Sequence, residues 1–409
     1  MAVIAGCRTP FSRAGSVFGA LPAVELARHA TRELIERTNL DGAVLDLIVM
    51  GQVVVSPLVP NLAREVSLLP QLPRTVPAYT VGEACASANQ AIIDAADAIA
   101  AGRADVAIAG GAESLSNIPL LLGKRLSDRL VAFNRAKTLG QRLHLIAGLR
   151  PRDFVPLAPA IAEPSTGLTM GQSAEKMAQE NGISRADQDA WALRSHRLAA
   201  AGLADGRLTA EIAPVAVDGT AIVADNGVRA DTSPEKMAAL PPVFDRRHGT
   251  VTAANASPLT DGASAVLLMA EEAARALGYE PLAWIRASAL KAVDPGGQLL
   301  MGPVDAVPVA LTRAGIGWAD LGLIEMHEAF AAQVLSNLQG FERRHGWTID
   351  RDRINVLGGS IAIGHPFGAT GGRLVTTLAC EMRRRGVPLG LVSVCAQGGM
   401  GSAIVLEAS

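Results

Sequence analysis

The chain has 409 residues, 49% of them hydrophobic and 19% charged, which is enough apolar material for a large core. Its 37 basic and 39 acidic residues leave a net charge of −2, so no overall positive field favours nucleic acid as a partner. Only 3% of residues are aromatic, which indicates tight packing of small side chains.

Residues 1–10 form an apolar run that is too short for a signal peptide, and no cationic region precedes it. No stretch reaches the roughly 18 apolar residues that a membrane-spanning helix needs. Four cysteines are far apart and lack metal-ligand spacing: Cys7, Cys85, Cys380 and Cys395. We therefore expect free thiols, no metal site and a cytoplasmic protein.

From residue 1 to about 116, short Val, Ile and Ala runs alternate with helical patterns, which is typical of a layered α/β fold. A helical stretch at 24–36 leads to a strand-like run at 45–51. Another strand-like run lies at 105–109.

Cys85 lies between an extended stretch at 75–81 and a predicted helix that ends at Gly102. One face of that helix carries Ala88, Ile92, Ala95 and Ile99. A cysteine at a helix N-terminus meets free backbone N–H groups and the helix dipole, which stabilise a thiolate. Cys85 is therefore a candidate nucleophile, and a buried structural cysteine is the alternative.

Residues 117–248 are richer in charge and Pro and show few strand signals, so we predict an inserted loop domain. Within it, residues 124–152 contain eight Lys or Arg and one acid, Asp128, with apolar residues at roughly helical spacing. This pattern predicts a basic amphipathic helix that docks on a membrane surface or a partner. A surface helix that only covers the loop domain is the alternative.

From residue 249 the α/β pattern returns, and its elements repeat those of the first zone. A helical stretch at 307–314 leads to a strand-like run at 320–327, as in the first zone. We interpret the chain as two duplicated halves, with residues 1–116 and 249–270 as the first half and 271–409 as the second.

Three further segments are candidates for chemistry. His327 and Glu328 follow a predicted strand, but no second histidine follows four residues on, so zinc is not expected. His365 lies in a glycine-rich run at 358–372, which implies a tight turn close to a ligand, with a helix from about Arg373.

Cys395 ends a predicted strand at the tip of a glycine-rich hairpin. Each of these segments alone also fits a structural role. An imidazole beside Cys85, however, would be able to accept the proton of its thiol.

The joint order Cys, His, His, Cys resembles the thiolase family over essentially the whole chain. The matching segments are 85–91, 110–114, 255–257, 261–263, 327–330, 364–366 and 395–399. Within the family the chain is most similar to the β-subunit of the fatty-acid-oxidation trifunctional enzyme. That subunit also has His-Glu-Ala-Phe, as at 327–330, where most thiolases have Asn-Glu-Ala-Phe.

The resemblance implies an α/β thiolase fold of five layers, α-β-α-β-α, built from the two halves. It also implies an acyltransferase that cleaves 3-ketoacyl-CoA with CoA in fatty acid β-oxidation, with CoA as co-substrate and no permanently bound cofactor. Cys85 would be the acylated nucleophile, His365 its activator and Cys395 a second acid/base. One carbonyl oxygen would meet His365 together with a water or side chain held by His327, and the other would meet the backbone N–H groups of Cys85 and Gln397.

For the CoA substrates the resemblance implies contacts from Ser257, Met170 and Phe330. The family usually has Gly at the position of Gln397, so that side chain must point away or narrow the site. Thr169 stands where many thiolases have His.

The resemblance further implies a homodimer or dimer of dimers, a hydratase/dehydrogenase partner subunit, and contact with membrane or partner through 124–152. Two alternatives stay open: a biosynthetic acetoacetyl-CoA thiolase with a shorter acyl pocket, and a non-catalytic scaffold subunit. A ketoacyl synthase also combines one cysteine with two histidines, but it would not need Cys395.

Overall fold

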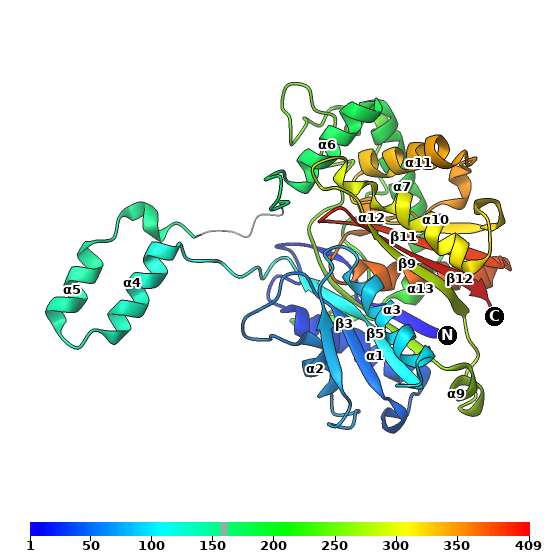
Figure 1. Ribbon diagram of the computed structural model, residues 1–409, viewed down its shortest axis with the longest axis horizontal. Helices are drawn as coiled ribbons and strands as arrows, with labels where there is room; N and C mark the ends of the chain where they lie inside the picture. The colour runs from blue at the N-terminus through cyan, green and yellow to red at the C-terminus, as the bar shows by residue number, and fades with distance from the viewer. Residues whose placement is uncertain (157–161) are drawn as a thin grey trace. The chain divides into compact units, whose positions relative to one another are not determined.

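A computed structural model describes residues 1–156 and 162–409 of the chain. It contains a main unit, residues 1–116 and 162–409, and a small unit, residues 117–161 (Figure 1). No helix among the described residues is long and apolar enough to cross a membrane.

The main unit is built on one ten-stranded sheet. Its strands are β1 (Ala2–Arg8), β2 (Ser12–Arg13), β3 (Leu47–Gly51), β4 (Ala78–Val81), β5 (Val106–Ser114), β8 (Thr260–Met269), β9 (Ala283–Ala292), β10 (Leu323–Met326), β11 (Leu389–Ala396) and β12 (Met400–Ala408). Their order is β10-β11-β12-β9-β1-β8-β5-β3-β4, with β2 paired to β8.

The strand pairing repeats between the two halves. In the first half, β3 runs parallel to β5, β5 antiparallel to β8, and β8 antiparallel to β1. In the second half, β10 runs parallel to β11, β11 antiparallel to β12, and β12 antiparallel to β9. Only two residue pairs, Ala2 with Trp284 and Val3 with Ala283, join β1 to β9. The duplication predicted from the sequence is therefore confirmed.

Helices form three layers around the two halves of the sheet. On the outside of the first half lie α1 (Ala23–Thr38) and α2 (Leu62–Ser67). On the outside of the second half lies α10 (Gly302–Ala314), covered in part by α11 (Ala331–His345). Between them, α3 (Ser87–Ala100) and α13 (Thr370–Arg385) contact each other and strands of both halves. These contacts give the five layers that the resemblance implies.

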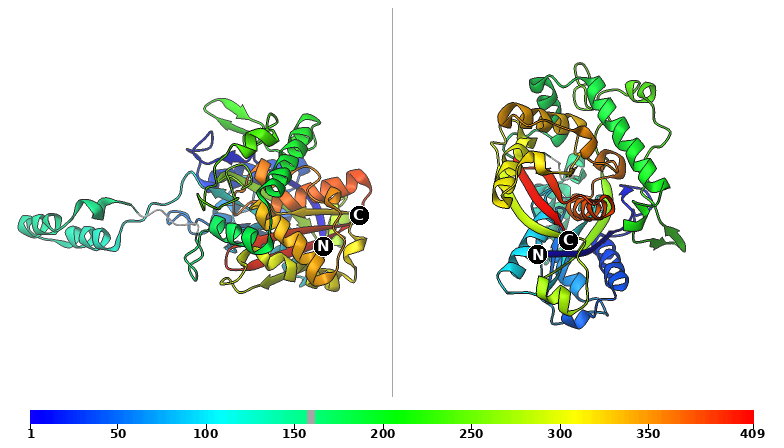
Figure 2. Two further views of the ribbon diagram at one scale, coloured as in Figure 1. Left: turned by 90° about the horizontal axis from the view of Figure 1, so that it is seen from above. Right: turned by 90° about the vertical axis from the view of Figure 1, so that its right-hand side faces the viewer.

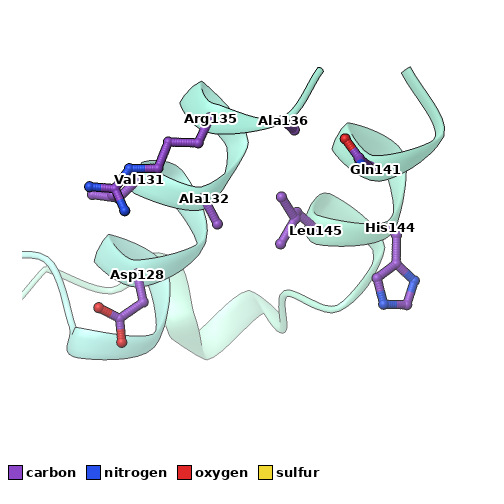
Figure 3. Close-up of a pocket in the computed structure, with 8 residues that line it drawn as sticks. All are labelled: Asp128, Val131, Ala132, Arg135, Ala136, Gln141, His144 and Leu145. Carbon is purple, nitrogen blue, oxygen red and sulfur yellow. The ribbon is translucent and has the colours of Figure 1, made fainter. Parts of the chain in front are cut away.

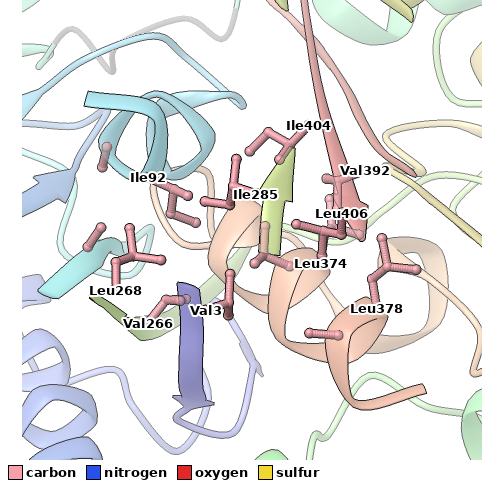
Figure 4. Close-up of a cluster of buried hydrophobic side chains, with 14 of the residues drawn as sticks. Val3, Ile92, Val266, Leu268, Ile285, Leu374, Leu378, Val392, Ile404 and Leu406 are labelled. Carbon is pink, nitrogen blue, oxygen red and sulfur yellow. The ribbon is translucent and has the colours of Figure 1, made fainter. Parts of the chain in front are cut away.

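The inner layer holds a large apolar core (Figure 4). Side chains from both halves meet around the central helices: Val3, Ile92, Val266, Leu268, Ile285, Leu374, Leu378, Val392, Ile404 and Leu406. Both ends of the chain lie close together, since Ala283 pairs with Val3 and with Ala408 (Figure 2). The core thus fixes the start of α3 relative to the start of α13, where the candidate catalytic residues lie.

The main unit also contains further helices and one small hairpin. They are α6 (Met170–Asn181), α7 (Arg185–Ala204), the hairpin β6 (Val215–Val217) and β7 (Thr220–Ile222), α8 (Pro234–Ala238), α9 (Glu271–Ala276) and α12 (Ser360–Ile363). Helix α13 begins at Thr370, earlier than the predicted start near Arg373. The glycines at 371 and 372 are helical because α13 packs closely there against α3 and β8.

The small unit is a helical hairpin of α4 (Lys124–Arg135) and α5 (Leu139–Ala147). The single amphipathic helix predicted for 124–152 is therefore wrong. Thr138 caps α5 in a capping box with Gln141, which ends the helical run between the two helices. Arg129 and Arg125 hold the hairpin by donating to the carbonyls of Leu145 and Gly148. The predicted limits of the loop domain, 117–248, stay a prediction.

Candidate active site

Cys85 lies in a tight turn between β4 and α3. Ala84 has a φ of +45°, in the left-handed region that residues with a side chain seldom adopt. The Ser87 hydroxyl closes the turn, since it donates to the Ala84 carbonyl at 2.7 Å and accepts from the Glu83 N–H at 2.8 Å. Such backbone strain costs roughly 1–3 kcal/mol and persists where the surrounding fold over-determines it, often at functional sites.

Two buried imidazole rings share the space beside Cys85. The ring centres of His327, which follows β10, and His365, which follows α12, are 4.0 Å apart. The Cys85 Sγ and one nitrogen of each ring all lie within 4.8 Å of one another. Nδ1 of His327 is 2.9 Å from the Ser360 hydroxyl, and Nδ1 of His365 is 2.6 Å from the Thr370 hydroxyl. Neither Nε2 has a hydrogen-bond partner among the described residues, although both are buried.

Burial disfavours the charged forms of the thiol and of both rings. Desolvation raises the pKa of Cys85 to about 12, and the backbone N–H groups of Gln397 and of Cys85 itself only partly oppose this. The thiolate stabilisation expected from the helix N-terminus is thus outweighed by burial. Burial and then the positive charge of Arg373 lower the pKa of His365 to about 3. Burial, His365 and Arg373 lower the pKa of His327 well below its usual value.

The predicted hairpin tip brings Cys395 and Gln397 to the same site. β11 and β12 pair up to Ala396 and Met400, so residues 397–399 form the turn. Cys395 is buried, and burial together with the nearby Cys85 raises the pKa of its thiol well above the usual value. The Gln397 side chain donates to the Ala162 carbonyl at 2.8 Å. Its backbone N–H interacts with the Cys85 sulfur. The side chain is therefore held by the backbone at Ala162.

Comparisons with known proteins agree with this arrangement. The family model "Thiolase, N-terminal domain" matches residues 1–272, and "Thiolase, C-terminal domain" matches residues 279–408. The chain belongs to the thiolase family. The family and the fold expected from the sequence are therefore confirmed.

Relatives of known name extend the match to the full chain. A 3-ketoacyl-CoA thiolase of Pseudoalteromonas translucida is 49% identical, covering 100% of this chain and 97% of the relative. One of Aeromonas salmonicida is 50% identical, covering 100% and 96%. Among solved structures, human mitochondrial 3-ketoacyl-CoA thiolase has a TM-score of 0.87 at 32% identity, covering 100% of this chain and 98% of that one.

The predicted CoA-side residues of this thiolase include two, Ser257 and Phe330, that adjoin the segment of His327. Ser257 donates its backbone N–H to the Ala329 carbonyl, and Ala256 pairs with Phe330. Phe330 meets Phe244 edge-on at 6.2 Å.

Met170 is the first residue of α6 and is followed by Gly171, at which a Cβ would lie 2.0 Å from the Phe244 ring. The Met170 side chain is mostly buried. Thr169, at the position of the usual His, is the N-cap of α6 and bonds Gln172. That residue therefore has a local structural role.

Sequence reasoning missed the polar residues that hold the site. The Thr370 hydroxyl contacts the ring of His365, and the Ser360 hydroxyl contacts the ring of His327. Both residues could have been suspected from the sequence because each places a hydroxyl in the glycine-rich run around His365. Glu328, by contrast, was already singled out beside His327 in the sequence. It accepts from Trp191, Ser195 and Asn355, so it ties α7 to the loop before α12.

Glu113 has a similar function at the end of β5. It accepts from the backbone N–H groups of Val53, Val54 and Gly368 at 3.0, 3.0 and 3.1 Å. It therefore holds the loop after His365 against the loop after β3. Burial raises the pKa of Glu113 to about 7, while these three donors oppose that shift.

Cys85, His327 and His365 are also close enough to one another to hold a metal ion. One thiol and two imidazoles form a ligand set of the type that binds zinc. The sequence predicts no metal here, and that expectation stays a prediction.

Proposed function

We propose that the protein is a 3-ketoacyl-CoA thiolase, which transfers the acyl group of a 3-ketoacyl-CoA to CoA and releases acetyl-CoA. The observation that carries the proposal is that the half-buried Cys85 thiol lies beside the rings of His327 and His365, whose buried Nε2 atoms have no partner among the described residues. The second thiol, of Cys395, is near Cys85. The relatives named 3-ketoacyl-CoA thiolase, 49–50% identical over the whole chain, support it. Cleavage and regeneration each need a nucleophile and a proton donor, which these groups supply.

His365 acts as the base for Cys85. Thr370 donates its own proton to the Pro366 carbonyl at 3.1 Å, so its oxygen accepts from Nδ1–H of His365. The proton of the neutral ring is therefore on Nδ1, and Nε2 keeps a lone pair. That lone pair accepts the Cys85 proton as the sulfur attacks the 3-keto carbon of the substrate.

Two oxygens gain negative charge during cleavage. The oxygen on the attacked carbon lies next to the sulfur, where the backbone N–H groups of Cys85 and Gln397 stabilise it. The C2–C3 bond then breaks, and the acetyl-CoA part leaves as an enolate. We assign the enolate oxygen to the Nε2–H groups of His327 and of the protonated His365. Each such donor is worth about 100- to 1000-fold in rate.

Cys395 completes both half-reactions. Its thiol protonates C2 of the enolate and becomes a thiolate, and acetyl-CoA departs. That thiolate accepts the proton of the incoming CoA thiol, and the CoA sulfur attacks the acyl group on Cys85. Cys85 leaves as a thiolate and recovers its proton from His365, so every group returns to its starting state.

The CoA substrates bind along the wall of Ser257, Phe330 and Met170. Ser257 and Phe330 lie on adjoining backbone segments, and Phe244 contacts Phe330 and lies close to Gly171 at the start of α6. CoA is a co-substrate in this scheme and not a resident cofactor. A human mitochondrial relative of 32% identity has been solved in complex with CoA.

The decisive test is a thiolysis assay with purified protein, CoA, and either acetoacetyl-CoA or 3-ketodecanoyl-CoA. We expect faster loss of the longer keto-thioester, and no turnover by Cys85→Ala. Cys380→Ala, half-buried on α13, is the matched control and should stay active. Turnover of acetoacetyl-CoA alone would favour the biosynthetic thiolase, and turnover of neither would favour a scaffold subunit.

We also propose a homodimer, or a dimer of dimers, built through the first half. β4 is the last strand of the sheet, so one of its edges has no neighbouring strand among the described residues. Tyr79 on β4 is an exposed large apolar side chain, and so are Val55 and Leu58 in the segment after the paired strand β3. A second copy would cover such an edge, and sedimentation analysis would show the dimer.

The small unit is proposed to dock on a membrane surface or on a hydratase/dehydrogenase subunit. It exposes apolar residues that include Leu130, Leu139, Leu143 and Ile146, among eight basic side chains. A hollow of about 630 Å³ between α4 and α5 is lined by Val131, Ala132, Arg135, Leu145 and others (Figure 3). Apolar and basic side chains together suit an anionic lipid surface.

We place the protein in the cytoplasm. Its four cysteines are all free thiols in the structure, as expected in a reducing compartment.

A further inference from the structure

Ser360 lies between one catalytic ring and a buried ion pair. It is the first residue of α12 and is fully buried. Its hydroxyl is 2.9 Å from Nδ1 of His327 and accepts from the Arg373 guanidinium at 3.3 Å. Arg373 is itself buried and pairs with Glu325 at 2.9 Å. The chain of contacts therefore runs from Glu325 through Arg373 and Ser360 to His327.

The direction of these hydrogen bonds follows from the chemistry of the groups. A guanidinium only donates, so the Ser360 oxygen uses an acceptor position for Arg373. No described residue other than His327 is within hydrogen-bond distance as an acceptor for the Ser360 proton. Ser360 therefore donates to Nδ1 of His327, which must be unprotonated to accept.

A neutral imidazole with an unprotonated Nδ1 carries its proton on Nε2. Burial, His365 and Arg373 lower the pKa of His327, which favours the neutral ring. Nε2 of His327 is the buried nitrogen without a partner, in the volume shared with Cys85 and His365. The hydrogen that it carries is thus free for a substrate oxygen.

We propose that Ser360, polarised by the Arg373–Glu325 pair, is a positioning residue that fixes the tautomer of His327 with its proton on Nε2. His327 then donates directly to the enolate oxygen of acetyl-CoA, without a bridging water. The two rings are consequently held in opposite tautomers, His365 as an acceptor and His327 as a donor. The kinetic part of this inference rests on the thiolase activity proposed above, and its tautomer part does not.

The kinetic test compares Ser360→Ala with Ser360→Thr, which keeps the hydroxyl. We expect Ser360→Ala to lower kcat for thiolysis about 10- to 100-fold, the usual cost of removing a group that orients a catalytic ligand. KM should stay within about twofold, because the interaction strengthens only as charge develops on the oxygen. Ser360→Thr should recover most of kcat.

Ser393→Ala is the matched control. Ser393 is a buried serine on β11 whose hydroxyl has no partner among the described residues. Its loss should leave kcat and thermal stability near those of the wild type. Equal effects of Ser360→Ala and Ser393→Ala would overturn the proposal.

The direct test is ¹⁵N NMR of the full-length protein with labelled histidine, which distinguishes protonated from unprotonated ring nitrogens. We expect His327 to be protonated on Nε2 and His365 on Nδ1, with the His327 pattern lost in Ser360→Ala. His327 protonated on Nδ1 in the wild type would overturn the proposal whether or not the protein is active. An inactive wild type with the expected tautomers would instead count against the thiolase function alone.

Discussion

Gly371→Ala tests whether the distance between the proposed nucleophile, Cys85, and its proposed base, His365, is set by contact between α3 and α13. A Cβ at Gly371 would lie 1.9 Å from Oδ1 and 2.6 Å from the backbone N of Asn89, four residues after Cys85. Ordinary contact begins at 3.4 Å. The Asn89 side chain is able to rotate, but its backbone is not, so the helices must separate by about 0.8 Å at this point.

Such a displacement should have two measurable effects. Overpacking costs about 1–3 kcal/mol of stability, which calorimetry would record as a lower Tm. A misplacement near 1 Å costs about 100-fold in rate, so we expect kcat for thiolysis to fall by one to two orders of magnitude. The matched control is Gly140→Ala, where a Cβ meets nothing within 4 Å. If Gly371→Ala kept the kcat and Tm of the wild type, close backbone contact between α3 and α13 would not set the distance between Cys85 and His365.

Three other changes test the remaining parts of the structure. Thr370→Val removes the acceptor for Nδ1–H of His365, so we expect kcat to fall at least tenfold. Thr370→Ser should restore kcat. A fully active Thr370→Val variant would contradict the tautomer assigned to His365. Burial raises the pKa of Glu211 to about 7, so the folded state binds this proton more tightly than the unfolded state, and stability should fall as pH rises from about 4.5 to about 7. Glu211→Gln should flatten that fall in thermal unfolding curves recorded across this pH range, and an unchanged slope would show that other groups cause it. Replacing the exposed Leu143 and Ile146 by Ser should weaken sedimentation with anionic liposomes without changing thiolysis, whereas equal binding by both proteins would exclude membrane docking through α5.

The elements around Cys85 and Cys395 could be predicted because their signals are local. Apolar residues at helical spacing and a closing Gly102 predicted α3, and alternation around a glycine-rich tip predicted the hairpin of β11 and β12. The two halves were detected because each repeats a helix and a strand at the same spacing. The local pattern of apolar residues was enough to predict an element wherever that element buries one face.

Other features depend on contacts between distant segments. The glycines at 371 and 372 looked like loop because helix interiors disfavour glycine, but here the missing side chains let α13 approach Asn89 and Ser264. The roles of Ser360 and Thr370 depend on which ring each hydroxyl reaches, which no spacing reveals. The raised pKa of Cys85 depends on how much of the fold covers the thiol, and a helix N-terminus alone predicted the opposite direction.

The break between α4 and α5 was available from the sequence. Thr138 and Gln141 form the Thr-x-x-Gln pattern of a capping box, which marks the start of a new helix. Regular spacing of leucines across the break concealed it.

Both attachment points of the small unit are next to groups that hold the reaction centre. At its start, Ser116 bonds Asp261, the neighbour of Thr260, whose hydroxyl holds the His365 backbone. At its end, Ala162 receives the Gln397 side chain. The two main-unit residues that flank the small unit, Ser116 and Ala162, are thus tied by hydrogen bonds to the segments that carry His365 and Gln397.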